Sequence, residues 1–292
     1  MRQAILDANA AAGADTITFA PSLGAATITL ASTLPDIADG AGLTIDGDNR
    51  ITLSGDDSVQ VLYVGVAGIL TLRNIIITHG SAIQGGGLNS DGTLTITHSA
   101  FLNNSSTGSG GGVSNGGTAT ITNSAFSNNS AHAGGGVTNN SGTATIFNST
   151  FSGNSITYDG GGVFTWNGRA SPPTTTIRNT ILANSAAGYA DCWNHNAGTL
   201  IGDHNIIETT STCNSIATIT SDPNLGALTG FPAYFPFNAG SPAIDAGSDA
   251  VCAAAPVSNT SQNGLTRPQG AHCDIGSYEA QVFLLYLPLV MR

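Results

Sequence analysis

One sequence is repeated three times between residues 85 and 154, and this repetition constrains the fold more than any other feature. The copies GGGLNSDGTLTITHSAFLNN, GGGVSNGGTATITNSAFSNN and GGGVTNNSGTATIFNSTFSGN begin at Gly85, Gly110 and Gly134, and a looser copy, GGGVFTWN, begins at Gly160. By subtraction of these positions, the copies start 25, 24 and 26 residues apart. A period of this size is typical of stacked repeats, in which each copy packs against its neighbours.

Alternating residues within each copy predict a β-strand with one buried face. In the first copy, Leu94 and Ile96 alternate with threonines, and the later copies have Ala and Ile at the same two places. A phenylalanine recurs at steps of 25 residues, with an asparagine three residues after it. If each copy is one coil, these side chains form an inward phenylalanine ladder and an asparagine ladder linked by amide hydrogen bonds. The two ladders are Phe101, Phe126 and Phe151, and Asn104, Asn129 and Asn154.

The fold predicted from this pattern is an all-β, single-stranded parallel β-helix with about 25 residues per coil. A helical solenoid is disfavoured because the segments between glycines are short and rich in threonine. A β-propeller is disfavoured because its blades need roughly 40 residues or more. About ten coils are expected, and at about 4.8 Å per coil they would make a rod roughly 50 Å long. A short helix in residues 2–12 is expected to cap the N-terminal end of the solenoid.

The repeats and both ends of the chain resemble known bacterial surface proteins. The GGGL and GGGV motifs, with FLNN, FSNN and FSGN, resemble the GGA(I/L/V) and FxxN repeats of chlamydial polymorphic outer-membrane proteins. The opening RQAILDANA and the closing segments are similar to those of the choice-of-anchor surface proteins. The resemblance implies a right-handed parallel β-helix that is exported and surface-associated, without a single implied activity. The closing segments are DPNLGAL (222–228), GSPAIDAGS (240–248) and RPQGAHCDIGSYE (267–279).

The predicted organisation is a single β-helix domain over residues 1–292. Its parts are an N-terminal cap (1–15), regular coils (16–185), irregular last coils and loops (186–281) and an apolar tail (282–292). Early strands are expected at 16–19, 27–30, 43–45, 51–53, 61–64 and 69–77. The loop NGRASPPT (167–174) should bulge outward because its prolines cannot join a ladder. Trp166 and Arg169 beside it could form a contact surface, and ordinary loop packing is the alternative.

The charge of the chain disfavours nucleic acids and anionic membranes as partners. Seven arginines are the only basic residues besides histidine, against 18 carboxylates, and the formal net charge is −11. Phosphate binding needs clustered cations, which this composition does not supply. No cofactor is expected, because the sequence has no cysteine or histidine spacing typical of a zinc site.

Four cysteines predict two disulfides and an oxidising compartment. Cys192 and Cys213, like Cys252 and Cys273, are 21 residues apart, roughly one coil. Disulfides within these two pairs are the simplest interpretation, and four free buried thiols are the alternative. We therefore expect an extracellular or cell-surface protein, whose export signal was removed or lies outside this sequence.

The C-terminal tail is apolar on both faces of a strand. At nine residues, VFLLYLPLV is too short to span a bilayer as a helix. Such a strand is expected to lie against its own solenoid, to add to a neighbouring molecule, or to anchor the chain to an envelope component. The residues concerned are Val282, Phe283, Leu284, Leu285, Tyr286, Leu287, Leu289 and Val290.

A catalytic interpretation depends on three residues, Asp56, Asp57 and His79. Gly55-Asp56-Asp57 is followed one coil later by Thr78-His79-Gly80, which resembles part of the polygalacturonase signature. The Asn-Thr-Asp and Arg-Ile-Lys motifs of that signature are missing, and a turn formed by SGDDS is the alternative. Calcium binding by the DGDN loop at 46–49, with Arg50 or Arg73 as a lyase base, is disfavoured because the full calcium loop is missing.

We therefore predict a non-enzymatic, exported structural or adhesive β-helix. Self-association through the ends of the solenoid or through the C-terminal strand is expected, because a sheet edge is a template for another chain. The alternative is a polysaccharide hydrolase or lyase of the pectinase-like class. A passive glycan-binding surface is a third possibility.

Overall fold

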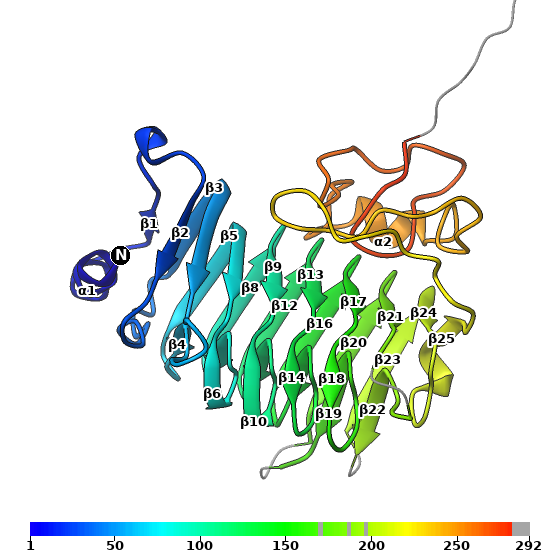
Figure 1. Ribbon diagram of the computed structural model, residues 1–292, viewed down its shortest axis with the longest axis horizontal. Helices are drawn as coiled ribbons and strands as arrows, with labels where there is room; N and C mark the ends of the chain where they lie inside the picture. The colour runs from blue at the N-terminus through cyan, green and yellow to red at the C-terminus, as the bar shows by residue number, and fades with distance from the viewer. Residues whose placement is uncertain (169–171, 186–187, 196–197, 282–292) are drawn as a thin grey trace, which may run out of the picture.

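The chain folds into a parallel β-solenoid, as the repeat predicts (Figure 1). The structure is a computed structural model that describes residues 1–168, 172–185, 188–195 and 198–281. The solenoid has about seven turns of about 25 residues each. The expected ten coils were an overestimate, because the chain after residue 221 leaves the stack and folds along its side (Figure 1).

In the described residues the stacked strands form three sheets, and the pairings between named strands are all parallel. The largest sheet has 15 strands: β1 (Asp15–Ile17), β2 (Ala26–Thr29), β3 (Leu43–Ser54), β5 (Ile69–Thr78), β8 (Thr93–Thr97), β9 (Ala100–Leu102), β12 (Thr118–Thr122), β13 (Ala125–Ser127), β16 (Thr143–Phe147), β17 (Thr150–Ser152), β20 (Thr174–Arg178), β21 (Ile181–Ala183), β23 (Thr199–Asp203), β24 (Asn205–Ile207) and β25 (Ala217–Ile219). A second sheet has six strands: β4 (Leu62–Val64), β7 (Leu88–Ser90), β11 (Val113–Asn115), β15 (Val137–Asn139), β19 (Val163–Trp166) and β22 (Cys192–His195). The third has four: β6 (Ser81–Gln84), β10 (Ser105–Ser109), β14 (Ser130–Ala131) and β18 (Ser155–Ile156).

Equivalent residues of successive repeats pair directly with one another. Phe126 lies in register with Phe101 and Phe151, and all three side chains are fully buried. Their rings stack with centroids 5.0 and 4.5 Å apart. Because a sheet places paired residues on the same face, a repeat of one coil length becomes a column of identical side chains.

The asparagine ladder forms as predicted and is buried. Nδ2 of Asn104 donates to Oδ1 of Asn129 at 2.9 Å, and Nδ2 of Asn129 donates to Oδ1 of Asn154 at 3.0 Å. Each amide also donates to a backbone carbonyl of the coil before it; Asn129, for example, donates to the carbonyl of Phe101 at 2.9 Å. The ladder thus satisfies polar groups that would otherwise be costly inside the solenoid.

The N-terminal helix α1 (Arg2–Ala10) covers the first coil. Ile5 and Ala8 of α1 are buried in the main core, and Asn9 exchanges hydrogen bonds with the backbone of Asp36 and Ala38. The predicted strands at 43–45 and 51–53 are one continuous strand, β3. It bends where the register shifts between Asp46 and Ile51.

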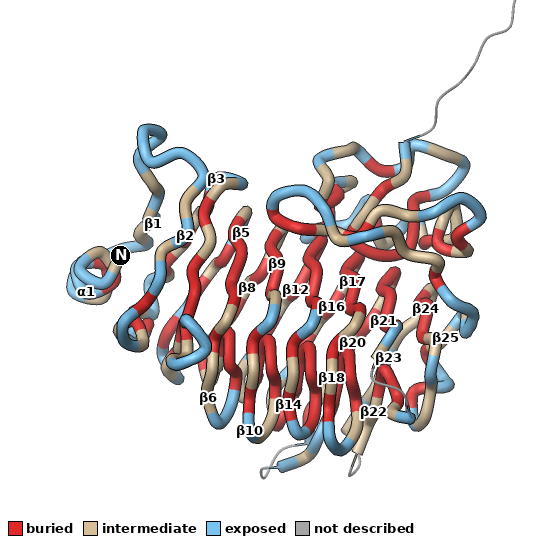
Figure 2. Tube along the Cα trace, in the orientation of Figure 1, coloured by how far each residue is buried: buried red, intermediate tan, exposed pale blue. Residues whose placement is uncertain are grey.

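Residues 222–281 lie along one side of the solenoid, over β9, β13, β17 and β21 (Figure 1). We call this segment the C-terminal cover. The cover contains the short helix α2 (Asp249–Ala253). Two 3-10 turns lie earlier in the chain, outside the cover: η1 (Pro21–Leu23) and η2 (Asn214–Ile216). The strands beneath the cover present apolar residues outward, so Ile181 and Ile206 pack against Ala243 and Ile275 of the cover. Figure 2 shows that this sheet is buried where the cover crosses it.

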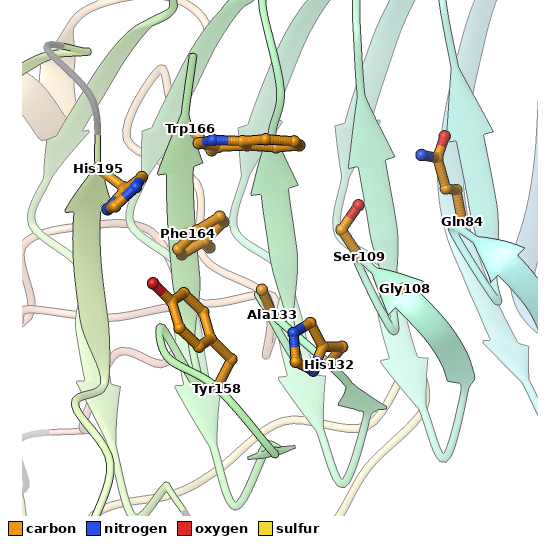
Figure 3. Close-up of a pocket in the computed structure, with 9 residues that line it drawn as sticks. All are labelled: Gln84, Gly108, Ser109, His132, Ala133, Tyr158, Phe164, Trp166 and His195. Atoms are coloured by element: carbon orange, nitrogen blue, oxygen red, sulfur yellow. The ribbon is translucent and has the colours of Figure 1, made fainter. Parts of the chain in front are cut away.

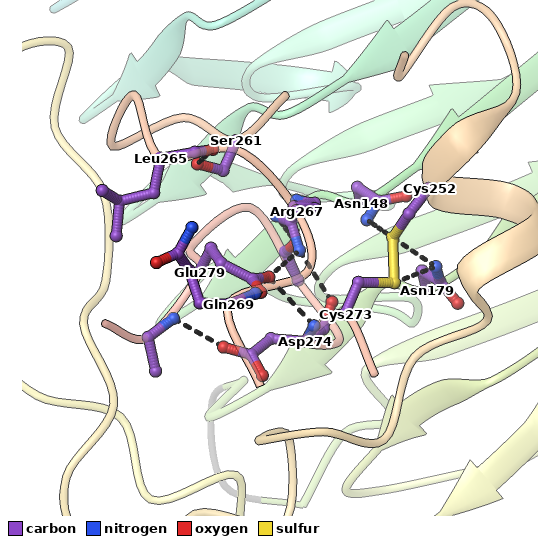
Figure 4. A network of polar contacts seen from close by, with 12 residues as sticks. Asn148, Asn179, Cys252, Ser261, Leu265, Arg267, Gln269, Cys273, Asp274 and Glu279 are labelled. Carbon is purple, nitrogen blue, oxygen red and sulfur yellow. Dashed lines mark hydrogen bonds and ion pairs between the residues drawn. A yellow bond between two sulfur atoms is a disulfide. The ribbon is translucent and has the colours of Figure 1, made fainter. Parts of the chain in front are cut away.

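A buried ion pair and a disulfide hold the C-terminal cover together (Figure 4). The side chains of Arg267 and Glu279 are fully buried, with Nη1 3.0 Å from Oε2. The guanidinium also donates to the carbonyls of Thr260, Asp274 and Gly276. Burial raises the pKa of Asp274 to about 6, although backbone hydrogen bonds from Ala280 and Asp245 lower it.

Both predicted disulfides are present. Cys192 pairs with Cys213, and Cys252 pairs with Cys273. The second bond lies beside the solenoid, where Nδ2 of Asn148 is 3.2 Å from Sγ of Cys252. Two disulfides indicate an oxidising, exported environment. In the described parts of the chain, no helix is both long and apolar enough to cross a membrane.

Candidate functional site

Asp57 and His79 come together, but in a turn at an exposed surface. Nδ1 of His79 is 3.0 Å from Oδ1 of Asp57, and the amide of Asp57 donates to the carbonyl of His79. Asp56, Asp57 and His79 all have left-handed backbone angles, with φ of 52°, 54° and 49°. The turn therefore accounts for these residue types without catalysis, because Asp tolerates this conformation better than most residues.

The acidic loop at residues 46–49 makes ion pairs and hydrogen bonds within the fold. Asp46 accepts from Arg73 at 2.8 Å and from Asn74 at 3.0 Å, while Arg50 pairs with Asp48 at 2.9 Å. Burial acts to raise the pKa of Asp46, but hydrogen bonds from the Asp48 amide, Asn74 and Arg73, with the Arg73 charge, hold it below its ordinary value. Within the described ranges, no three His, Cys, Asp or Glu residues are placed to hold a metal ion.

An open groove of about 390 Å³ runs along the solenoid between the six-stranded and four-stranded sheets (Figure 3). Its residues come from successive coils, so its long direction follows the solenoid axis. They are Gln84 of β6, Gly108 and Ser109 of β10, His132 and Ala133 after β14, Tyr158 after β18, Phe164 and Trp166 of β19, and His195 of β22. We call this the aromatic groove.

Phe164 forms the buried floor of the aromatic groove. It stands in register with Thr138 of the preceding coil, where the copy GGGVFTWN replaces GGGVTNN. Phe164 packs against Gly160, the first glycine of its copy. A Cβ added to Gly160 would be only 2.9 Å from Cβ of Phe164. Gly160 also has φ of +75°, so both the space and the backbone angle require glycine there.

Two further rings continue the aromatic surface from Phe164. The Tyr158 ring meets Phe164 edge-on, with centroids 6.3 Å apart, and stacks on His132 at 5.5 Å. The His132 Nδ1 lies 2.9 Å from Oγ1 of Thr157, which fixes the imidazole beside Tyr158. Tyr158 remains 43% exposed, so one side of its ring is available to a ligand.

Trp166 borders the other side of the groove and is 37% exposed. Its indole packs against Gly168, where an added Cβ would be 2.8 Å from Cζ3. His195 is its register partner on the next coil. The sequence correctly singled out Trp166 as an exposed aromatic residue. The proposed neighbour Arg169 lies outside the described residues.

The described lining of the aromatic groove carries no formal charge. Asp, Glu, Lys and Arg do not occur among its described lining residues, and its side-chain polar groups are two imidazoles, two hydroxyls, an indole N–H and an amide. Asp57 and His79 do not line it. Glycoside hydrolysis usually needs two carboxyl groups flanking the scissile bond, and the described lining contains none.

His98 stands at the position that Asn123 and Asn148 occupy in later copies, and it is partly buried. It lies under residues 259–266 of the C-terminal cover, and Asn123 beside it donates to Oγ1 of Thr260 at 2.9 Å. Burial lowers the pKa of His98, and the charge of Arg267 lowers it further. The position that His98 and Asn123 occupy in their copies therefore contributes to packing of the C-terminal cover.

Comparison with known proteins found no match. The chain matched no protein-family model, no curated protein and no solved structure among those compared. The resemblance to the polymorphic and choice-of-anchor surface proteins is thus supported at the level of the parallel β-solenoid, and no family is identified.

Proposed function

We propose that this protein is a non-enzymatic, exported adhesive β-solenoid that binds its ligand in the aromatic groove. The observation that carries the proposal is the groove itself: the exposed rings of Tyr158 and Trp166 line one surface whose described residues carry no charge. Aromatic residues are typical of binding sites because they offer a large apolar area with few rotatable bonds. The two disulfides support export, and the extracellular medium or cell surface is the location we propose.

A mixed array of oligosaccharides and extended peptides tests this function. We expect the protein to retain at least one class of probe, and Trp166→Ala to abolish that retention. Phe231→Ala is the matched control, because Phe231 is also 37% exposed but lies in the C-terminal cover. Retention that is unaffected by Trp166→Ala, or the lack of any retention, would contradict adhesion through this groove.

The contact between Asp57 and His79 favours a second candidate, a polysaccharide hydrolase or lyase. The proposed function predicts that polygalacturonate and neutral polysaccharides are not cleaved. It also predicts that Asp57→Asn has no effect on the release of sugar. Release of reducing or unsaturated sugar by the unaltered protein, with loss in Asp57→Asn, would establish the enzyme instead.

Self-association through the tail is part of the proposed structural role. The apolar residues 282–290 lie outside the described part of the chain, and their composition is the support for this proposal. Strand addition is favoured over end-to-end stacking because α1 covers the N-terminal coil. Light scattering should show assemblies of the full chain and monomers after deletion of residues 282–292. Identical masses for both proteins would contradict the proposal.

A further inference from the structure

We propose that the aromatic groove binds an uncharged glycan chain lying along the solenoid axis. This inference rests on the proposed adhesive function and specifies its ligand. Four features support it: the exposed aromatic rings, the polar side chains, the absence of charge in the described lining, and the pairing of β19 on both sides.

The exposed rings suit the flat apolar faces of sugars. Trp166 and Tyr158 come from different parts of one coil and are both more than one third exposed, while Phe164 between them is buried (Figure 3). The indole of Trp166 is held against Gly168, and the phenol ring of Tyr158 is held by His132 and Phe164. Rings that are already fixed lose little conformational entropy when a sugar ring stacks on them.

The polar groups of the groove suit hydroxyl groups. His132, His195, Ser109 and Gln84 offer nitrogen and oxygen atoms that can donate or accept hydrogen bonds. Sugar hydroxyls do both, so such mixed groups can pair with them in more than one orientation. These four residues lie on four different coils between Gln84 and His195, which favours a chain ligand over a single small molecule.

The uncharged lining favours an uncharged glycan over an acidic one. The described lining contains no arginine or lysine that could pair with a uronate or sulfate group. The whole chain carries a formal net charge of −11, which would repel a polyanion over the distance of a Debye length. Acidic polysaccharides are therefore expected to bind weakly at this site.

An extended peptide is a less suitable occupant because the groove offers it no free strand edge. β19, which carries Phe164 and Trp166, is already paired on one side with β15 and on the other with β22. Peptides that bind in extended form usually gain affinity by adding a strand to an open edge. A peptide in this groove would have to leave its own backbone groups to water.

Intrinsic fluorescence provides a direct readout, because the chain has only two tryptophans. Trp193→Phe leaves Trp166 as the sole indole and keeps an aromatic ring beside Phe164. We expect cello-, xylo- or manno-oligosaccharides to shift the Trp166 emission in a saturable manner, and oligogalacturonate to have no comparable effect.

Calorimetry on the otherwise unaltered chain should show at least a tenfold loss of affinity in Trp166→Ala, none in Phe231→Ala, and an intermediate loss in Gly168→Ala. The far-ultraviolet spectrum and the unfolding midpoint verify that each variant is folded.

The outcomes separate the ligand class from the adhesive function. Trp166-dependent binding of peptides, or of oligogalacturonate only, would overturn the neutral glycan and leave groove-mediated adhesion standing. If no probe binds in a manner that depends on Trp166, both proposals are wrong. Oligosaccharide binding that is equal in Trp166→Ala and the unaltered chain would place the glycan elsewhere and also overturn the inference.

Discussion

Replacing Arg267 with methionine is expected to destabilise the protein by about 3–5 kcal/mol, with the loss concentrated in the C-terminal cover. The guanidinium is fully buried, pairs with Glu279 at 3.0 Å and donates to three backbone carbonyls. Methionine replaces only the aliphatic part of the arginine side chain, so the change leaves the Glu279 carboxylate buried without its partner cation. Burial already lowers the pKa of Arg267 to about 10, while Glu279 and Asp274 act to raise it, which indicates a substantial desolvation cost.

Urea unfolding and limited proteolysis measure this effect together. Arg178→Met is the matched control, because Arg178 pairs with Asp203 at 3.3 Å with both side chains partly exposed. We expect it to change stability by less than about 1 kcal/mol. Arg267→Met combined with Glu279→Gln should recover part of the loss, because no unpaired carboxylate remains. Equal unfolding midpoints and equal cleavage within residues 249–280 for the two arginine variants would refute the role of the buried pair.

Phe126→Ala is expected to destabilise the solenoid by about 3–5 kcal/mol. Phe126 is completely buried, and its ring stacks on Phe101 at 5.0 Å and on Phe151 at 4.5 Å. Truncation would leave a cavity between two rigid coils, which cannot collapse without breaking the register on both sides. The loss should appear as a lower midpoint of chemical unfolding.

The chain itself supplies a conservative comparison for this position. Leu182 is the register partner of Phe151 on the next coil, so the column already contains a leucine. Phe126→Leu should therefore cost clearly less than Phe126→Ala. Phe147→Ala tests an aromatic residue that is only partly buried on the outer side of β16 and should cost the least. The reverse order of these three variants would show that the phenylalanine column does not support the core.

The sequence predicts the solenoid well because its repeats are nearly identical and adjacent. A step of one coil places Phe101 over Phe126 and Asn104 over Asn129, so the local pattern alone determines the stacking. The C-terminal cover has no repeat, and its contacts join residues that are far apart in the chain, such as Asn148 and Cys252. Its course along the side of the solenoid could not be derived from periodicity.

The aromatic groove was largely missed for the same reason. Tyr158, Phe164 and His132 lie in different copies or in the links between them, and only the stacking brings them to one surface. One signal was available: the copy GGGVFTWN has Phe164 and Trp166 where the preceding copy has Thr138 and Asn140. A repeat that exchanges polar for aromatic residues on its outer face departs from the needs of packing and marks a candidate binding site.

Distances between spin labels along one outer column test the stacked solenoid most directly. Thr71, Thr95, Thr120, Thr145, Thr176 and Ile201 are successive register partners on β5, β8, β12, β16, β20 and β23. Each coil adds about 4.8 Å, so the backbone positions of Thr71 and Ile201 should be about 24 Å apart, and those of Thr71 and Thr176 about 19 Å apart. Spin labels on cysteines introduced at these positions report the two separations. A distance that grows by one strand spacing per coil is the predicted result. Equal distances for the two pairs, or distances unrelated to the number of coils between the labels, would contradict the solenoid and the aromatic groove built on it.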